Sequence, residues 1–179
     1  MGASSIRDVL SLGFLEKNET LIISGSIHSD MNDLARALGR KAEREGGGVL
    51  LIKAGDLFQL LAQERAGKKS TTGAVRPARA RLLVVENLGM KKLTLSQTRD
   101  FSDLMAERIN HAPTVITSPY LLIQWASHMP GSEEGKLLLN SLLKHARQAV
   151  IGGKLKKKEK KPAPIDEPMQ ACRQAIHGP

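Results

Sequence analysis

Short apolar runs alternate with helical patterns along most of this chain of 179 residues. Runs suited to strands occupy residues 21–24, 49–52, 82–85, 114–117 and, more briefly, 149–151. Helical patterns occupy residues 1–18, 33–44, 56–65, 96–110 and 133–147. The runs are continuously apolar, so we expect strands buried on both faces, 49–52 included. This alternation predicts an α/β fold: a three-layer parallel sheet of about five strands with helices on both faces.

The segment after the first run has the position of a phosphate-binding loop but not its residues. It joins a strand to a helix, as a G-x-x-x-x-G-K-[ST] loop does, and begins with the required Gly25. Asp30 replaces the second glycine, Met31 the lysine, and Asn32 the Ser/Thr that binds magnesium. A phosphate site needs positive charge and free backbone N–H groups. We therefore interpret Asp30 as a side-chain cap of the following helix, in the place that a phosphate would take.

Other polar residues follow the later runs. Glu86 and Asn87 follow the third run, residues 117–119 end the fourth, and residues 140–141 lie in the last helical pattern. Ligands of parallel sheets bind at the carboxyl ends of the strands. We therefore expect these segments to lie together with the Gly25 loop.

In this order and spacing, the chain resembles the IstB/DnaC-like branch of the AAA+ ATPases from about residue 6 to about residue 153. The resemblance is carried by residues 13–19, 25–35, 54–57, 82–89, 117–118, 142–146 and Trp125. It implies a P-loop NTPase fold of the AAA+ type, with strand order 5-1-4-3-2. It also implies ATP and magnesium binding, assembly on DNA, and a role as a transposition helper or helicase loader.

The chain departs from this family where the chemistry takes place. The Walker B Asp-Glu pair corresponds to Glu86 and Asn87, the sensor Asn to Pro119, and the later Asp-Arg pair to Asn140 and Ser141. We therefore expect no ATP hydrolysis, assign no catalytic residue or metal, and expect no cofactor, although the resemblance allows weak ATP and magnesium binding. The positions of the degenerate Walker motifs are Gly25, Ser26, Ile27, His28, Ser29, Asp30, Met31, Asn32, Glu86 and Asn87.

The charge of the chain favours a polyanionic partner, with nucleic acid first. The net charge is +9 and the pI is about 9.9. We expect DNA contacts, largely independent of sequence, from Lys68, Lys69, Arg76, Arg79, Lys154, Lys156, Lys157, Lys158, Lys160 and Lys161. Aromatic residues make up only 3% of the chain, so we interpret Tyr120 and Trp125 as core or interface residues, not as base-stacking ones.

We divide the chain into an AAA+ domain over residues 1–153 and a basic, proline-containing tail without fixed structure over 154–179. No apolar run approaches the ~20 residues of a membrane span, so we expect a cytoplasmic protein without a membrane partner. The preferred function is a non-hydrolysing, DNA-associated helper or regulatory subunit in transposition or replication. Its partner could be an intact AAA+ ATPase, a transposase or a replicative helicase. The alternatives are an active DNA-dependent ATPase with unusual ligands and a decayed mobile-element remnant.

Overall fold

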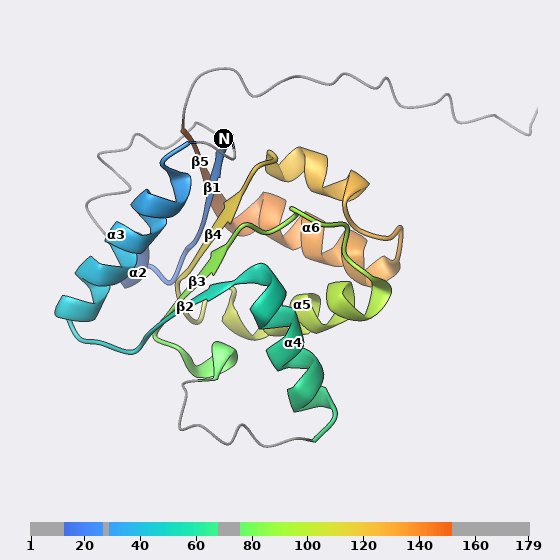
Figure 1. The fold of residues 1–179 in the computed structure, drawn as a ribbon, viewed down its shortest axis with the longest axis horizontal. Helices are drawn as coiled ribbons and strands as arrows, with labels where there is room; N and C mark the ends of the chain where they lie inside the picture. Colours follow the sequence, from blue (N-terminus) through green and yellow to red (C-terminus); the bar gives the residue numbers. More distant parts are fainter. Residues whose placement is uncertain (1–12, 27–28, 68–75, 152–179) are drawn as a thin grey trace, which may run out of the picture.

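The computed structural model describes residues 13–26, 29–67 and 76–151 (Figure 1). Its elements are, in order, α2 (Gly13–Glu16), β1 (Thr20–Gly25), α3 (Met31–Arg44), β2 (Val49–Lys53), α4 (Ala54–Arg65), the 3-10 helix η1 (Pro77–Arg79), β3 (Leu82–Glu86), α5 (Leu95–Arg108), β4 (Thr114–Ser118), the 3-10 helix η2 (Leu122–Ser127), α6 (Glu133–His145) and β5 (Ala146–Ile151).

The five strands form one parallel sheet in the order β2-β3-β4-β1-β5. This confirms the predicted order, counted from the opposite edge. The register aligns Ser24 with Ser118 and Gly25 with Ile151, while Glu86 ends β3 beside Lys53. The carboxyl ends of the strands therefore lie side by side at one end of the sheet, as we expected for the segments of the site.

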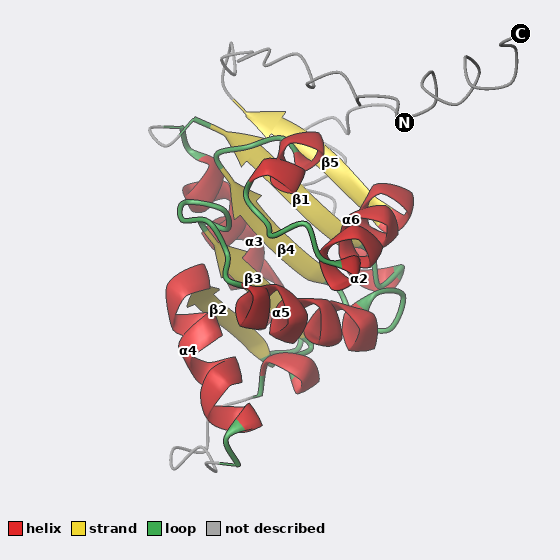
Figure 2. Cartoon of the chain, turned by 90° about the vertical axis from the view of Figure 1, so that its right-hand side faces the viewer, coloured by secondary structure: helices red, strands yellow, loops and turns green. Residues whose placement is uncertain are grey.

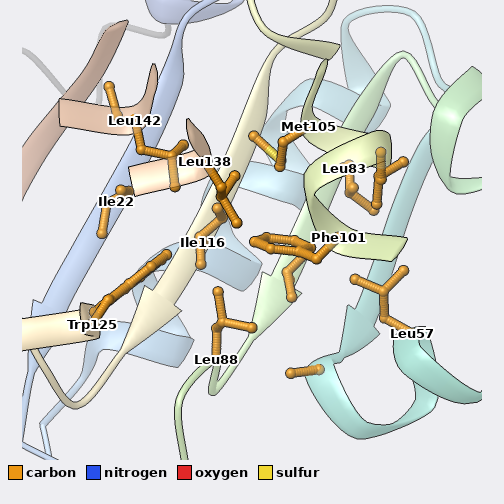
Figure 3. Packing of buried hydrophobic residues seen from close by; sticks show 14 of the residues in the cluster. Ile22, Leu57, Leu83, Leu88, Phe101, Met105, Ile116, Trp125, Leu138 and Leu142 are labelled. Carbon is orange, nitrogen blue, oxygen red and sulfur yellow. The ribbon is translucent and has the colours of Figure 1, made fainter. Parts of the chain in front are cut away.

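Helices cover both faces of the sheet, which confirms the three layers (Figure 2). Residues of β1 alternate between the faces: Leu21 and Ile23 pack in the cluster beneath α3, and Ile22 packs in the cluster beneath α5 and α6. Trp125 of η2 lies in this second cluster and is only 1% exposed, so its interpretation as a core residue is confirmed (Figure 3). Apolar side chains thus pack on both faces of the sheet.

Strand β2 corrects one prediction. We expected residues 49–52 to be buried on both faces, yet the strand is only partly buried and Leu51 is 43% exposed. The reason is its place: β2 lies at the edge of the sheet and pairs only with β3. An apolar run alone does not distinguish a central strand from an edge strand.

Three helix ends also differ from the predictions. The first helix ends at Glu16 instead of residue 18. The last helix ends at His145, not at residue 147, because Ala146 and Arg147 already pair with Thr20 and Leu21 of β1. Similarly, α5 ends at Arg108 instead of residue 110.

Parts of several predictions lie outside the described residues: helix residues 1–12, loop residues 68–75, and the tail with its domain boundary at 153/154. Across the residues that are described, no helix is both long and apolar enough to cross a bilayer.

Candidate functional site

The loop after β1 closes on itself as a turn. The backbone N–H of Ser29 donates to the carbonyl oxygen of Ser26 at 2.9 Å, and the Ser29 hydroxyl donates to the same oxygen at 2.7 Å. A Cβ at Gly25 would collide with the side chain of Ser29 and lie 2.9 Å from the carbonyl oxygen of Ile151. Ile27 and His28 lie outside the described residues. At least the N–H group of Ser29 is therefore not free to receive a phosphate.

The residue at the lysine position points into the core. Met31 begins α3 and is fully buried, in the cluster that includes Ile23, Leu38 and Val84. In a phosphate-binding loop the lysine at this position reaches the β- and γ-phosphates. Here the corresponding side chain contributes to packing between α3 and the sheet.

Asp30 does not act as the side-chain cap that we expected. Its carbonyl oxygen accepts from the N–H of Leu34 at 2.8 Å, as an N-cap residue does, but its exposed carboxylate makes no capping hydrogen bond. The backbone explains why: φ is −73° and ψ is 19°, whereas a capping side chain usually needs an extended N-cap. The interpretation of Asp30 as a self-supplied phosphate substitute is therefore wrong.

Asn32, Asn87 and Thr117 form a closed polar triangle. Asn32 Nδ2 donates to Asn87 Oδ1 at 2.9 Å, the hydroxyl of Thr117 donates to Asn32 Oδ1 at 2.6 Å, and the backbone N–H of Asn87 donates to Thr117 Oγ1 at 2.8 Å. Asn87 has a φ of 63°, a left-handed conformation that asparagine tolerates well. The residues at the magnesium position and at the second Walker B position thus bond to each other.

Glu86 is held by an arginine that the sequence analysis missed. Its side chain is 1% exposed and accepts two hydrogen bonds from Arg36, Nε to Oε1 at 2.6 Å and Nη2 to Oε2 at 3.1 Å. These bonds and the charge of Glu86 raise the pKa of the Arg36 guanidinium above its usual value. Arg36 lies four residues after Asn32, on the same side of α3. That helical spacing was the signal that could have revealed it.

The later motif positions take no part in this cluster. Among the described residues, no hydrogen bond or ion pair joins Asn140 or Ser141 to it, and Asn140 is exposed on α6. At the end of β4, the N–H of Tyr120 donates to Ser118 Oγ at 3.2 Å, and Ser24 Oγ donates to the Tyr120 carbonyl oxygen at 3.0 Å. The segment around Pro119 is therefore fastened to β1 without a sensor side chain.

Magnesium and ATP do not fit these residues as they stand. The carboxylate at the metal position already has a cation, the amide at the Ser/Thr position is hydrogen-bonded within the triangle, and the lysine position is apolar and buried. A general base also needs a free acceptor within reach of its substrate. The hydrogen bonds and the ion pair of the cluster thus join protein groups to one another.

The predicted DNA-binding residues of the folded body lie near the amino ends of the strands, opposite to the cluster around Glu86. Arg76 precedes η1 and Arg79 is its last residue; η1 lies before the amino end of β3, and both arginine side chains are exposed. Arg79 lines a cavity of about 520 Å³ together with Arg81, Glu107 and His111. Lys68, Lys69 and the six tail lysines lie outside the described residues. The strand that precedes the tail in the sequence, β5, ends at Ile151 among the carboxyl ends of the strands. The structure therefore does not bring Arg76 and Arg79 close to Ile151, the last residue of β5.

The sheet order, with a loop and helix after β1 and polar residues ending β3 and β4, defines a P-loop NTPase fold of the AAA+ type. The structure resembles that of the DnaC helicase loader with a TM-score of 0.64 and 19% identity, covering 85% of this chain and 94% of that one. It also resembles the replication initiator DnaA bound to AMPPCP and single-stranded DNA, with a TM-score of 0.63 and 15% identity, covering 84% and 47%. At these identities the likeness concerns the fold.

The sequence defines the family. The chain belongs to the IstB-like ATP binding proteins, whose family model matches residues 1–163. An ATP-binding protein of insertion sequence IS5376 from Geobacillus stearothermophilus is 28% identical over 144 residues, which cover 79% of this chain and 56% of that protein. The IS21 ATP-binding protein of Pseudomonas aeruginosa is 25% identical over 158 residues, covering 87% and 60%. The chain therefore spans 56% to 60% of the length of these two relatives.

Proposed function

We propose that this chain is a non-hydrolysing member of the IstB/DnaC-like group that acts as a DNA-associated helper or regulatory subunit in transposition or replication. One observation carries the proposal: the residues at the metal and Walker B positions bond to one another and to Arg36. Among them, Asn32 bonds to Asn87, and Glu86 bonds to Arg36. The names of these two relatives assign them to insertion sequences, which supports a role in transposition.

Losing these chemical groups should lower the rate of ATP hydrolysis by a large factor. Phosphoryl transfer depends on positioning and on charge stabilisation by lysine, metal and arginine. Removing one such donor typically lowers the rate by ~10²–10³. Here Met31, Asn32 and Asn87 replace three of the chemical groups, and losses within one site do not add simply. Little activity should survive even so, whereas the fold does not need these groups.

An ATPase assay on the full chain tests this part of the proposal. We expect no turnover above background, with or without duplex or single-stranded DNA, and only weak binding of Mg–ATP. A DNA-stimulated turnover of ~1 s⁻¹ or more, within the ordinary enzyme range, would favour the alternative of an active DNA-dependent ATPase with unusual ligands. Sequences of close relatives address the other alternative, because a decayed remnant would vary at random at these positions.

The DNA part of the proposal rests on charge. The net charge of +9 and the lysine-rich segment 154–161 favour contacts with phosphates and little reading of bases. We propose that the tail carries most of these contacts and that Arg76, Arg79, Lys68 and Lys69 add to them. An intact AAA+ ATPase, a transposase or a replicative helicase in the cytoplasm would be the protein partner.

Salt-dependent DNA binding tests this assignment. Each phosphate contact contributes ~0.9 to the slope of log affinity against log salt on duplex DNA. Changing the six lysines of segment 154–161 to Gln should therefore flatten the slope by several units. Changing Arg76 and Arg79 to Gln is the matched control in the body and should flatten it by at most ~2 units. An unchanged slope in the lysine variant would move the DNA site to the folded surface, and no binding at all would leave a protein as the target.

A further inference from the structure

We propose that Arg36 is a built-in cation that takes the structural place of a divalent metal at this site, so that α3 is latched to β3 and β4 without a nucleotide. The inference deepens the proposed function, and it rests on that function for the claim that this site works without nucleotide. It concerns how the degenerate site is held together.

Glu86 occupies the position of a metal-binding carboxylate. In P-loop proteins the metal is held between the Ser/Thr at the start of the helix and the Walker B carboxylate. These two positions are Asn32 and Glu86 here. Glu86 is 1% exposed at the end of β3, and a buried carboxylate without a counter-charge is strongly unfavourable. Keeping an acid at this position therefore requires a cation.

Arg36 supplies that cation from the same helix that carries the metal position. Its guanidinium binds both oxygens of Glu86, at 2.6 and 3.1 Å, in the two-pronged geometry that suits arginine. The other acid facing it is Asp33, at 3.8 Å and 77% exposed, so Glu86 is the main partner. The Arg36 side chain is 42% exposed, which leaves it on the solvent side of the buried carboxylate, where a hydrated metal ion would have access.

The neutral triangle of Asn32, Asn87 and Thr117 provides a second connection between α3 and the sheet. One helical turn before Arg36, Asn32 bonds to Thr117 at the end of β4 and to Asn87 just after β3. Helix α3 is therefore tied to two neighbouring strands through two independent connections, one charged and one neutral. In a nucleotide-dependent protein such links form through the metal and the phosphates; here the side chains make them directly.

Thermal unfolding of the full chain tests the proposal with four proteins: wild type, R36A, R36A/E86Q and R40A. We expect R36A to lower the Tm by on the order of 5 °C, because it leaves Glu86 buried and unpaired. Adding E86Q should restore most of that loss, since the neutral amide needs no cation. R40A removes an exposed arginine one turn further along α3, which has no ion pair within the described part of the chain, and should leave the Tm unchanged.

The response of the Tm to divalent cations shows whether Arg36 replaces a metal ion or only forms an ordinary ion pair. Millimolar Mg²⁺ or Mn²⁺, compared with NaCl at equal ionic strength, should raise the Tm of R36A and leave wild type and R36A/E86Q unchanged. A Tm of R36A equal to that of wild type, no rescue by E86Q, or no response of R36A to either metal would each overturn the proposal. A rise in the wild-type Tm with Mg–ATP would instead count against the proposed nucleotide independence, so the two failures are distinguishable.

Discussion

The hydroxyl of Thr117 donates a hydrogen bond of 2.6 Å to Oδ1 of Asn32, 85 positions away in the sequence. The same hydroxyl oxygen accepts the backbone N–H of Asn87 at 2.8 Å, and Asn87 in turn accepts from Asn32. Each member of the triangle is thus hydrogen-bonded to the other two. This arrangement connects the start of α3 with the ends of β3 and β4 at the place where the fold usually binds metal and nucleotide.

Removing the Thr117 hydroxyl should therefore destabilise the fold. T117V is nearly isosteric but leaves Asn32 Oδ1 and the Asn87 N–H without their partner, so we expect a loss of ~1–3 kcal/mol in the free energy of unfolding. Chemical denaturation measures it. The matched control is T20V: Thr20 is 2% exposed in β1, and its hydroxyl has no hydrogen-bond partner within the described residues. T20V should be neutral or stabilising, and equal losses in both variants would contradict the role of the triangle.

Restoring the missing lysine should harm the protein instead of reviving the site. Met31 is fully buried, so M31K places an ammonium group in the cluster between α3 and the sheet. We expect a loss of ~2 kcal/mol or more in unfolding free energy. M90K, at a methionine that is 48% exposed, should change stability little. A stable M31K variant that binds ATP more tightly would show that the methionine is the only obstacle to the nucleotide.

Two helix N-termini should respond differently to loss of the N-cap side chain. Asp30 makes no capping bond, so D30A should lower the unfolding free energy by less than ~0.5 kcal/mol. Ser132 caps α6 by accepting the N–H of Gly135 at 3.2 Å, so S132A should cost ~1 kcal/mol. Melting curves of both variants at low and high salt would measure this. A larger effect of D30A than of S132A would restore the capping interpretation.

Arg108 should be among the residues on which stability depends most. It is fully buried, and its guanidinium donates to Thr114 Oγ1 and to the carbonyl oxygens of Pro77, Ala78, Ala80 and Pro113 at 2.6 to 3.4 Å. R108M would remove all of these hydrogen bonds, and we expect a loss on the order of 3 kcal/mol. R99M, at an exposed arginine of the same helix, is the control. Equal stability of R108M and wild type would contradict this role.

The stability contribution of Arg108 should also depend on pH at the alkaline end. Burial lowers the pKa of its guanidinium to about 10. Between this pH and the higher ordinary pKa of arginine, the unfolded chain binds more protons at this position than the folded one, so stability rises with pH there. The difference in unfolding free energy between wild type and R108M should therefore stay constant through neutral pH and grow in favour of wild type above pH about 10. Denaturation series across this range would measure it, and a decline would contradict the sign.

Much of the architecture was predictable from the sequence, and the predictions that failed share a cause. The apolar runs identify all five strands, because strand formation follows local composition and short-range alternation with helices. The exposure of Leu51 and the early end of α6 at His145 were not predictable in this way. Both depend on which strands are neighbours: β2 has one partner in the sheet, while Ala146 pairs with Thr20 far back in the chain.

The sequence by itself determined which chemical groups are missing: Met31, Asn32 and Asn87 lack the charges that phosphates and metal require, wherever they lie. Only the tertiary structure decided what these residues do instead. Arg36 and Glu86 are 50 positions apart, and Asn32 and Asn87 are 55 apart. Their contacts depend on the side of α3 that faces the sheet and on the backbone angles at residues 30 and 87. Hydrogen bonds and ion pairs form only when the distance between the two groups is right to within a few tenths of an ångström. The packing of distant segments sets these distances, and the local sequence does not.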